Sequence, residues 1–143
     1  MRDAPFVGHG GSGTGYHSPV NPDEKFAPLY LYVQRLDGFV AAEAPYAGGE
    51  MITRPLRFAG NRLLLNIDTG AVGYAQVGLL DESNRPIPGF SVDDCVYVNG
   101  DFVNTPVEWL HKGSDLSSLA GKTVRVVFRM RGARLFAMQF ARQ

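Results

Sequence analysis

The sequence has one cysteine, one tryptophan and no excess of charge of either sign, and these shortages limit the kinds of fold and partner that we expect. With Cys95 alone, no internal disulfide can form. The redox compartment stays open, because secreted proteins can also lack disulfides. Lys plus Arg number 14 and Asp plus Glu number 14. No global cationic field therefore favours nucleic acid or an anionic membrane as a partner.

Long apolar runs are also missing. The longest apolar stretches are the size of β-strands, which predicts no membrane-spanning helix. The N-terminus, from Met1 to Pro5, lacks an apolar run of signal-peptide length, so we expect no export signal within this chain. If a longer parent protein is secreted or periplasmic, its signal lies outside this chain, and the localisation is left open.

What is present is the composition of one folded domain. The chain has 143 residues, of which 45% are hydrophobic and 20% charged, values typical of a soluble domain that can bury a core. Residues 8–22 read GHGGSGTGYHSPVNP, a composition that gains little from packing and favours a loop or linker. We therefore expect a Gly/Ser/Pro-rich leader at residues 1–25 and a folded domain at residues 26–143.

Within that domain, short apolar runs are separated by turn residues, which is typical of a β-sandwich or barrel. Side chains alternate along residues 62–68, and the same alternation recurs from residue 123. The residues expected to face the core are Leu63, Leu65, Ile67, Val124, Val126, Phe128, Met130, Phe136, Met138 and Phe140. The predicted strands are residues 29–36, 38–43, 51–58, 62–69, 74–81, 95–98, 102–109, 123–131 and 134–140.

Three dipeptides place a glycine where a turn needs positive φ, which favours antiparallel hairpins at those points. They are Asp37-Gly38, Asn99-Gly100 and Arg131-Gly132. Pro86, Pro88 and Gly89 interrupt the middle of the chain and predict the long crossover that a Greek key requires.

One segment has the pattern of a short helix. Ser114 or Asp115 can cap its start, and Gly121 can end it. Leu116 and Leu119 would share its buried face. Because one or two turns are too few for an α/β protein, we predict an all-β fold. The expected architecture is a two-layer antiparallel β-sandwich, jelly-roll-like, with one short helical turn.

Several segments resemble a known accessory module. SDLSSLAGKTVRVVF (114–128) and ARLFAMQF (133–140) are similar to the end of a C-terminal β-sandwich that accompanies five-bladed propeller domains. The parent proteins are glycoside-hydrolase-like, of the invertase type. Further segments similar to this module, which together with those two cover roughly residue 29 to the end, are RLDGFV (35–40), TRPLRF (53–58), LLLNIDT (63–69) and IPGFS (87–91).

The resemblance implies a non-catalytic role. In that family the catalytic carboxylates belong to the propeller, and no segment of this chain is long enough to be one. We therefore expect no enzyme activity and no cofactor. The partner that the resemblance implies is carbohydrate or a neighbouring catalytic domain.

Other motifs that could indicate a cofactor, metal or catalytic site have simpler structural interpretations. Residues 8–13 fit GxGxxG, but the strand and helix of a dinucleotide site do not flank them. His9, His17 and His111 lack the spacing of a zinc site. Cys95 lies in an apolar run and is more typical of a small core residue than of a nucleophile.

Acidic pairs occur at Asp81-Glu82 and Asp93-Asp94. Two carboxylates could form a glycosidase pair, but acids beside turns more often accept hydrogen bonds from loop backbone. Clustered oxygens around Asp93 and Asp94 also suit calcium, although no EF-hand spacing is present.

Aromatic residues offer a surface for sugar. Trp109 with Tyr97, Tyr74 or Tyr46 could form a stacking platform for a sugar ring; the alternative, which we favour, is that Trp109 lies half-buried between the sheets. The candidate ligand-binding residues are Trp109, Tyr97, Asp93, Asp94, Asn99 and Asp101. A basic stripe could meet an anionic glycan, or form a solvated face with carboxylate neighbours; its members are Arg125, Arg129 and Arg131.

Two functions from different classes follow. The first is an accessory β-sandwich module that packs against or extends a glycan-acting domain and contacts carbohydrate through aromatic and polar loop residues. The second is a structural or assembly module that docks to a partner domain or to a second copy through apolar side chains on a sheet face.

Overall fold

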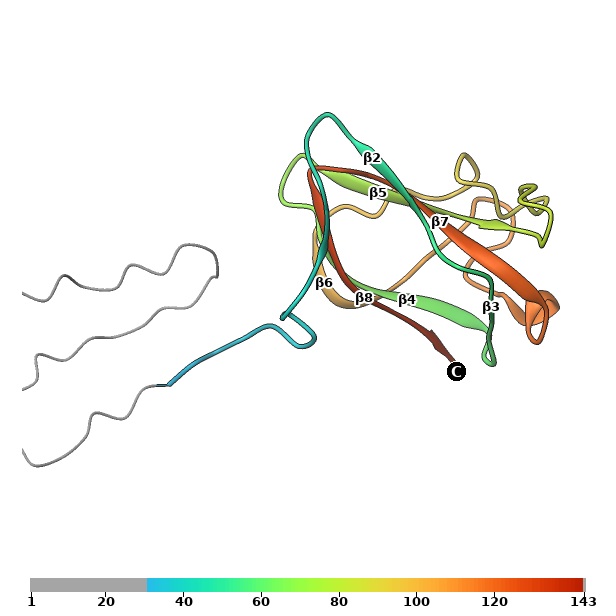
Figure 1. Ribbon diagram of the computed structural model, residues 1–143, viewed down its shortest axis with the longest axis horizontal. Helices are drawn as coiled ribbons and strands as arrows, with labels where there is room; N and C mark the ends of the chain where they lie inside the picture. The colour runs from blue at the N-terminus through green and yellow to red at the C-terminus, as the bar shows by residue number, and fades with distance from the viewer. Residues whose placement is uncertain (1–30, 143) are drawn as a thin grey trace, which may run out of the picture.

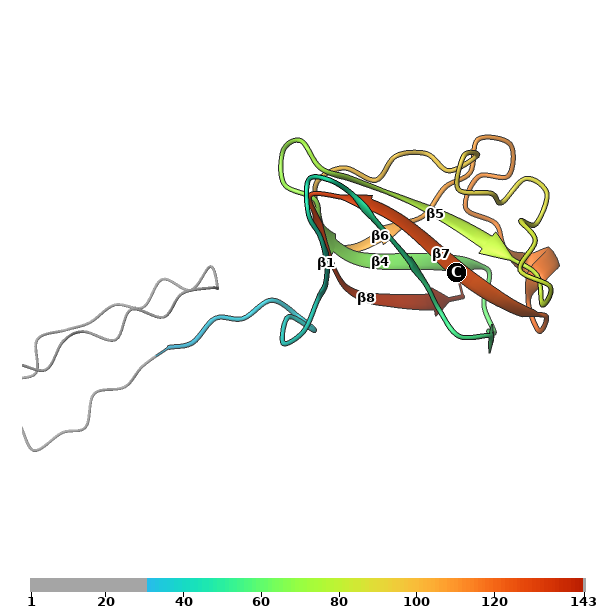
Figure 2. The same ribbon diagram turned by 45° about the horizontal axis from the view of Figure 1, so that its top comes forward.

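The computed structural model describes residues 31–142, and these residues form two antiparallel β-sheets that face each other (Figures 1 and 2). The first sheet has the order β1-β8-β4-β6. In the second, β2 and β3 pair with β7, and β5 also pairs with β7. The strands are β1 (Ala42–Ala44), β2 (Gly49–Ile52), β3 (Leu56–Arg57), β4 (Arg62–Asp68), β5 (Tyr74–Leu80), β6 (Asp101–Pro106), β7 (Thr123–Arg131) and β8 (Ala133–Ala141). The predicted all-β, two-layer antiparallel sandwich is confirmed.

The pairing is nested, as if one long hairpin had been rolled up. β1 pairs with β8, β2 and β3 pair with β7, and β4 pairs with β6. Innermost, Ala75 of β5 forms a single bridge with Val98. Successive segments lie in opposite sheets, which is the topology of a jelly roll. The segment around Pro86 and Pro88 folds back onto β5, with Pro86 bridging Leu80. The long connection between β5 and β6 crosses from the second sheet to the first only after Val98, which still bridges β5.

The core lies between the sheets and is built from the alternation seen in the sequence. Leu63, Leu65 and Ile67 of β4 are fully buried. The inward face of β7 is buried as well, and consists of Val124, Val126, Phe128 and Met130. Alternation places these side chains on one face because successive Cβ atoms of a strand point to opposite sides of the sheet.

The strand β8 departs from simple alternation at Phe136. Ile67 pairs with Leu135 but its neighbour Asn66 pairs with Ala137, so Phe136 is an extra residue, a β-bulge. The bulge shifts the phase of the strand, and Phe136 lies outside the core, with the guanidinium of Arg35 4.8 Å from its ring centroid. The prediction that Phe136 fills the core is wrong for this reason. Met138 and Phe140 pack against the core as expected.

The three predicted hairpin turns are corners or bends instead. At Gly132, φ is 53° and the chain passes from β7 in one sheet to β8 in the other, so no hairpin forms. A Cβ on Gly132 would stand 2.6 Å from the ring of Tyr46, which packs beneath this corner. Near Gly38 the positive φ falls on Asp37, at 55°. Gly100, with φ of 135°, also leads between sheets.

The short helical turn is confirmed as η1 (Ser117–Leu119), a 3₁₀ turn. The Asp115 carboxylate accepts hydrogen bonds from the backbone N–H and hydroxyl of Ser117. Leu116 and Leu119 are buried, and Gly121 adopts a φ of 78° where the turn ends.

Several predicted boundaries are wrong. Residues 31–36 form no strand, although the segment was predicted as one from residue 29. The run at 51–58 is divided into β2 and β3, and residues 95–98 make isolated bridges instead of a ladder. None of the described residues belongs to a helix that is long and apolar enough to cross a membrane. The predicted leader at residues 1–25 lies outside the described residues.

Candidate functional site

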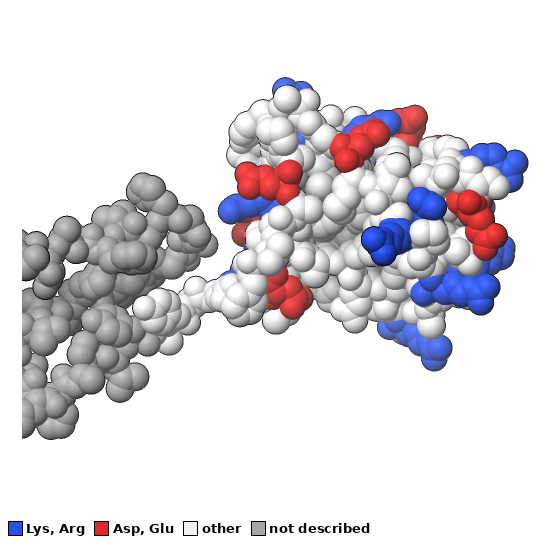
Figure 3. All heavy atoms as spheres, viewed as in Figure 1, with Lys and Arg blue, Asp and Glu red and all other residues white. Residues whose placement is uncertain are grey.

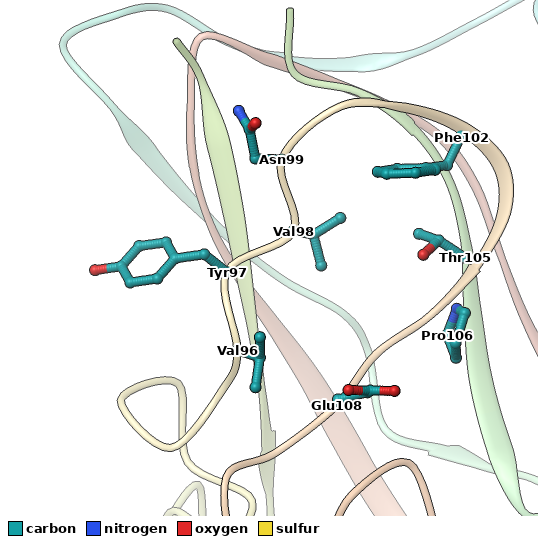
Figure 4. Close-up of a pocket in the computed structure, with 8 residues that line it drawn as sticks. All are labelled: Val96, Tyr97, Val98, Asn99, Phe102, Thr105, Pro106 and Glu108. Carbon is teal, nitrogen blue, oxygen red and sulfur yellow. The ribbon is translucent and has the colours of Figure 1, made fainter. Parts of the chain in front are cut away.

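An open cleft lies where the two sheets diverge at one edge of the sandwich (Figure 4). One wall is the segment 96–99, which bridges to β5 in the second sheet. The other wall is β6 of the first sheet and the residues that follow it. The cleft has a volume of about 210 Å³, and its lining residues are Val96, Tyr97, Val98, Asn99, Phe102, Thr105, Pro106 and Glu108.

Backbone hydrogen bonds close both ends of this edge cleft. At one end the Val96 N–H donates to the Glu108 carbonyl at 2.8 Å. At the other end the Thr69 N–H donates to the Gly100 carbonyl at 3.0 Å, and the Gly100 N–H donates to the Thr69 hydroxyl at 2.8 Å. Gly100 is needed here because a Cβ would stand 2.9 Å from the ring of Phe102. The walls are therefore held apart by a fixed frame.

The lining combines apolar and hydrogen-bonding groups. Phe102 and Val96 are exposed. Val98, which lies on the same wall as Val96, is buried and adds apolar surface to the lining. The hydroxyl of Thr105 and the carboxylate of Glu108 lie along the β6 side (Figure 4). Among residues 31–142, no ion-pair partner is found for Glu108 within 4.0 Å. This carboxylate is the one ionisable side chain of the lining other than the phenol of Tyr97.

Three of the predicted ligand-binding residues lie at the edge cleft or beside it. The Asn99 amide donates to the Gly73 carbonyl at 2.5 Å and so also supports the frame. Asp101 follows at the start of β6, where its carboxylate forms an ion pair with Arg35. Tyr97 is 62% exposed, but its ring points away from the cleft interior (Figure 4). It meets the ring of Tyr74 edge-on, with centroids 5.0 Å apart.

Asp93 and Asp94 do not converge on a common point. The Asp93 carboxylate accepts a hydrogen bond from Arg129 at 2.8 Å. The Asp94 carboxylate accepts hydrogen bonds from the hydroxyl of Ser91 at 2.7 Å and from its backbone N–H at 3.3 Å. These contacts are those expected for loop acids. No group of three His, Cys, Asp or Glu side chains within residues 31–142 is arranged to hold a metal ion, and the calcium interpretation stays a prediction.

Trp109 lies in the core and is 1% exposed. Its indole N–H donates to the Val77 carbonyl at 2.9 Å, and its ring meets that of Phe90 edge-on. We favoured a half-buried ring between the sheets, and the structure buries it completely. Its assignment as a ligand-binding residue is wrong, because the stacking face is covered by protein. Cys95 is also a core residue, and burial raises the pKa of its thiol to about 11.

Within the basic stripe on β7, Arg129 has carboxylate neighbours. It forms ion pairs with Glu50 and Asp93, and the hydrogen bonds that it donates to Asp93 and then to Glu50 raise the pKa of its guanidinium. The positive charge of Arg129 is therefore already balanced by carboxylates of this protein, which weakens its electrostatic attraction for an anionic glycan.

Sequence reasoning missed Phe102, Thr105 and Glu108. It treated Asn99-Gly100 as a hairpin turn, which would have paired the segments on either side of it. Instead the two segments pair only far from the turn, where Cys95 bridges Trp109. Nearer the turn Val98 bridges β5 while β6 joins the first sheet, and the edge cleft opens between them. A second β-bulge contributes, since Leu65 pairs with Thr105 and Ile67 with Phe102.

Fold and cleft together define a jelly-roll sandwich domain with an open, mixed polar and apolar edge site. No family model, curated protein or solved structure matches this chain.

Proposed function

We propose that this chain is a non-catalytic accessory β-sandwich module of a carbohydrate-acting, glycoside-hydrolase-like protein, and that it contacts glycan at the edge cleft. The observation that carries the proposal is the lining itself, which sets an exposed aromatic ring, Phe102, beside the hydroxyl of Thr105 and the carboxylate of Glu108. The resemblance to the sandwich of invertase-type proteins points the same way.

The chemistry of sugars suits such a lining. A pyranose ring has an apolar C–H face that packs on an aromatic or aliphatic surface, and a rim of hydroxyl groups that need hydrogen-bond partners. Glu108 and Thr105 supply acceptors for that rim, and hydrogen bonds to a charged acceptor are stronger than neutral ones. The edge cleft is open enough to admit part of a chain without enclosing it.

The charge of Glu108 should discriminate between neutral and acidic glycans. Glu108 has no cation within ion-pair distance among the described residues. A uronate or sulfate placed at this cleft would meet an uncompensated carboxylate. The proposal therefore assigns neutral sugars to the site.

Affinity electrophoresis against soluble neutral polysaccharides, backed by a glycan array, tests the proposal. We expect the wild-type chain to be retarded by at least one neutral glycan. Glu108→Gln keeps the shape of the side chain but removes its charge, and should weaken binding by about tenfold, the value of one charge-assisted hydrogen bond.

Leu110→Ala is the matched control, because Leu110 is exposed but does not line the edge cleft. It should leave retardation unchanged. Absence of retardation on every glycan would contradict the proposal, and so would equal weakening by Leu110→Ala and Glu108→Gln.

A structural or assembly module is the second candidate. It is favoured by a separate observation, the row of exposed apolar side chains in residues 31–40, where the chain enters the sandwich. That row does not overlap the lining of the edge cleft.

A further inference from the structure

Residues 31–40, here called the entry segment, expose an unusual amount of apolar surface. Six of the ten residues are large and apolar, and each is between 66% and 88% exposed. They are Leu31, Tyr32, Val33, Leu36, Phe39 and Val40. A solvated linker is normally polar, and a contiguous apolar strip of this kind marks an interaction surface.

The entry segment is fixed to the domain at one point. Arg35 donates hydrogen bonds to the Asn66 side chain at 2.6 Å and to the Phe102 carbonyl at 2.5 Å, and also pairs with Asp101. Asn66, itself buried, returns a hydrogen bond to the Leu36 carbonyl at 2.7 Å. The direction of the entry segment is therefore set by the first sheet.

Residues 31–34 lead away from the sandwich (Figure 1). They make no backbone–backbone hydrogen bond with any described residue. In Figure 3 the narrow neck that joins the sandwich to the grey atoms is almost entirely uncharged. An extended apolar segment whose backbone groups have no backbone partner among residues 31–142 is the kind of element that β-augmentation and strand exchange use.

The contacts of Arg35 with Asn66 and its neighbours are here called the anchor. The outer face of the first sheet carries a groove beside this anchor. Here called the sheet groove, it has a volume of about 450 Å³. Its apolar lining includes Leu64, Val103 and Ala137, and its polar lining includes the amides of Asn104 and Gln139. Leu36 and Asp37 of the chain's own entry segment border it as well. These amides can satisfy the backbone of an incoming extended segment, while the apolar side chains receive its side chains.

We propose that the occupant of the sheet groove is the entry segment of a second copy of this chain, in a reciprocal two-fold dimer. The Gly/Ser/Pro-rich composition is confined to residues 8–22, and the eight residues before the strip, DEKFAPLY (23–30), continue its apolar character with Phe26, Leu29 and Tyr30. The anchor at Arg35 directs residues 31–34 away from their own sandwich. A second copy supplies both the groove and a segment in exchange, as an isologous contact requires.

Area and charge agree with this occupant. Six side chains with these exposures present on the order of 800 Å² together, close to the share of each partner in a standard-size interface. The 14 basic and 14 acidic residues balance, so two copies have no net repulsion to overcome.

Sedimentation velocity over a concentration series tests the dimer with the full chain. We expect a monomer–dimer equilibrium for the wild type. The triple variant Leu31→Ser, Tyr32→Ser, Val33→Ser should raise the dissociation constant at least about tenfold. At a dilution where the wild type is also monomeric, the two proteins should unfold at the same temperature, because these side chains are exposed in the monomer. The matched control is Val72→Ser with Leu110→Ser, two equally exposed apolar residues elsewhere, which should sediment like the wild type.

A mixing experiment makes the test specific to this pair of surfaces. Val103→Arg should block the sheet groove, so that this variant alone is also monomeric. An equal mixture with the triple variant contains one intact segment and one intact groove per pair. It should therefore recover part of the dimer. A wild type that is monomeric throughout the series, or a triple variant that dimerises like the wild type, would overturn the inference. So would a mixture without any recovery.

Discussion

The Nε atom of Arg35 donates a hydrogen bond to Oδ1 of Asn66 at 2.6 Å, and this contact joins the entry segment to the middle of β4. Asn66 sits where both neighbouring strands carry a bulge, opposite extra residues of β6 and β8. The bulges open the outer face of the sheet enough to admit a planar guanidinium, which also lies over the ring of Phe136. The anchor thus depends on irregularity in the sheet.

Arg35→Ala should therefore destabilise the domain. It removes the Arg35 donor from the buried amide oxygen of Asn66, and we expect the free energy of unfolding to fall by about 1–3 kcal/mol in urea titrations. Arg35→Lys should recover little of this, because an ammonium cannot reproduce the planar fork. Arg85→Ala, which breaks an exposed pair with Asp81, is the control and should change stability by less than about 0.5 kcal/mol. Equal effects of Arg35→Ala and Arg85→Ala would show that the anchor contributes nothing.

The core tryptophan supports a second prediction. Trp109→Ala removes a fully buried ring and should lower the free energy of unfolding by about 3–5 kcal/mol. Trp109→Phe keeps most of the ring but leaves the buried Val77 carbonyl without its donor, and should lower it by about 1–3 kcal/mol. Chemical denaturation measures both, with the exposed Leu110→Ala near zero as reference. A neutral Trp109→Ala would contradict the placement of this ring in the core.

Two glycines with similar φ angles allow the cost of backbone strain to be measured separately from the cost of a steric clash. Gly113 and Gly132 have φ of 60° and 53°, but only Gly132 has heavy atoms, those of Tyr46, within 4 Å of an added Cβ. Gly113→Ala should cost about 1–2 kcal/mol for the left-handed conformation alone. Gly132→Ala should cost more, because the corner between β7 and β8 must also move away from the ring. Equal losses in thermal or urea unfolding would contradict the tight packing of this corner.

The buried thiol of Cys95 predicts that the free energy of unfolding falls at alkaline pH. Burial raises the pKa of the Cys95 thiol from its ordinary value of 9.0 to about 11, although a backbone hydrogen bond from Val77 acts in the opposite direction. The folded state therefore holds the proton more tightly than the unfolded state. This contribution to stability is complete below about pH 9 and is lost as the pH rises towards 11.

Urea titrations from pH 8 to pH 11 measure this loss. Cys95→Ala should show a shallower decline than the wild type, because it lacks the buried thiol. Identical slopes would show that the thiol is accessible to solvent. Slow alkylation of the native protein, and fast alkylation in denaturant, provides an independent check.

Much of the fold could be predicted from local pattern. The alternation in residues 62–68 and 123–131 gave β4 and β7 correctly, because a face of apolar side chains at every second residue can be buried only by a strand. The short turn at Leu116 and Leu119 was equally clear. The edge cleft could not be predicted in this way. Its walls are neighbours in sequence, and the choice between pairing with each other and joining opposite sheets depends on distant strands.

The sequence by itself determined that this protein is a β-sandwich with a core of alternating aliphatic side chains, since period and turn residues are local properties of the chain. Only the tertiary structure decided that Phe136 leaves the core and that Gly132 turns a corner between sheets. These outcomes depend on register, and register is set by the summed packing and hydrogen bonding of strands far apart along the chain.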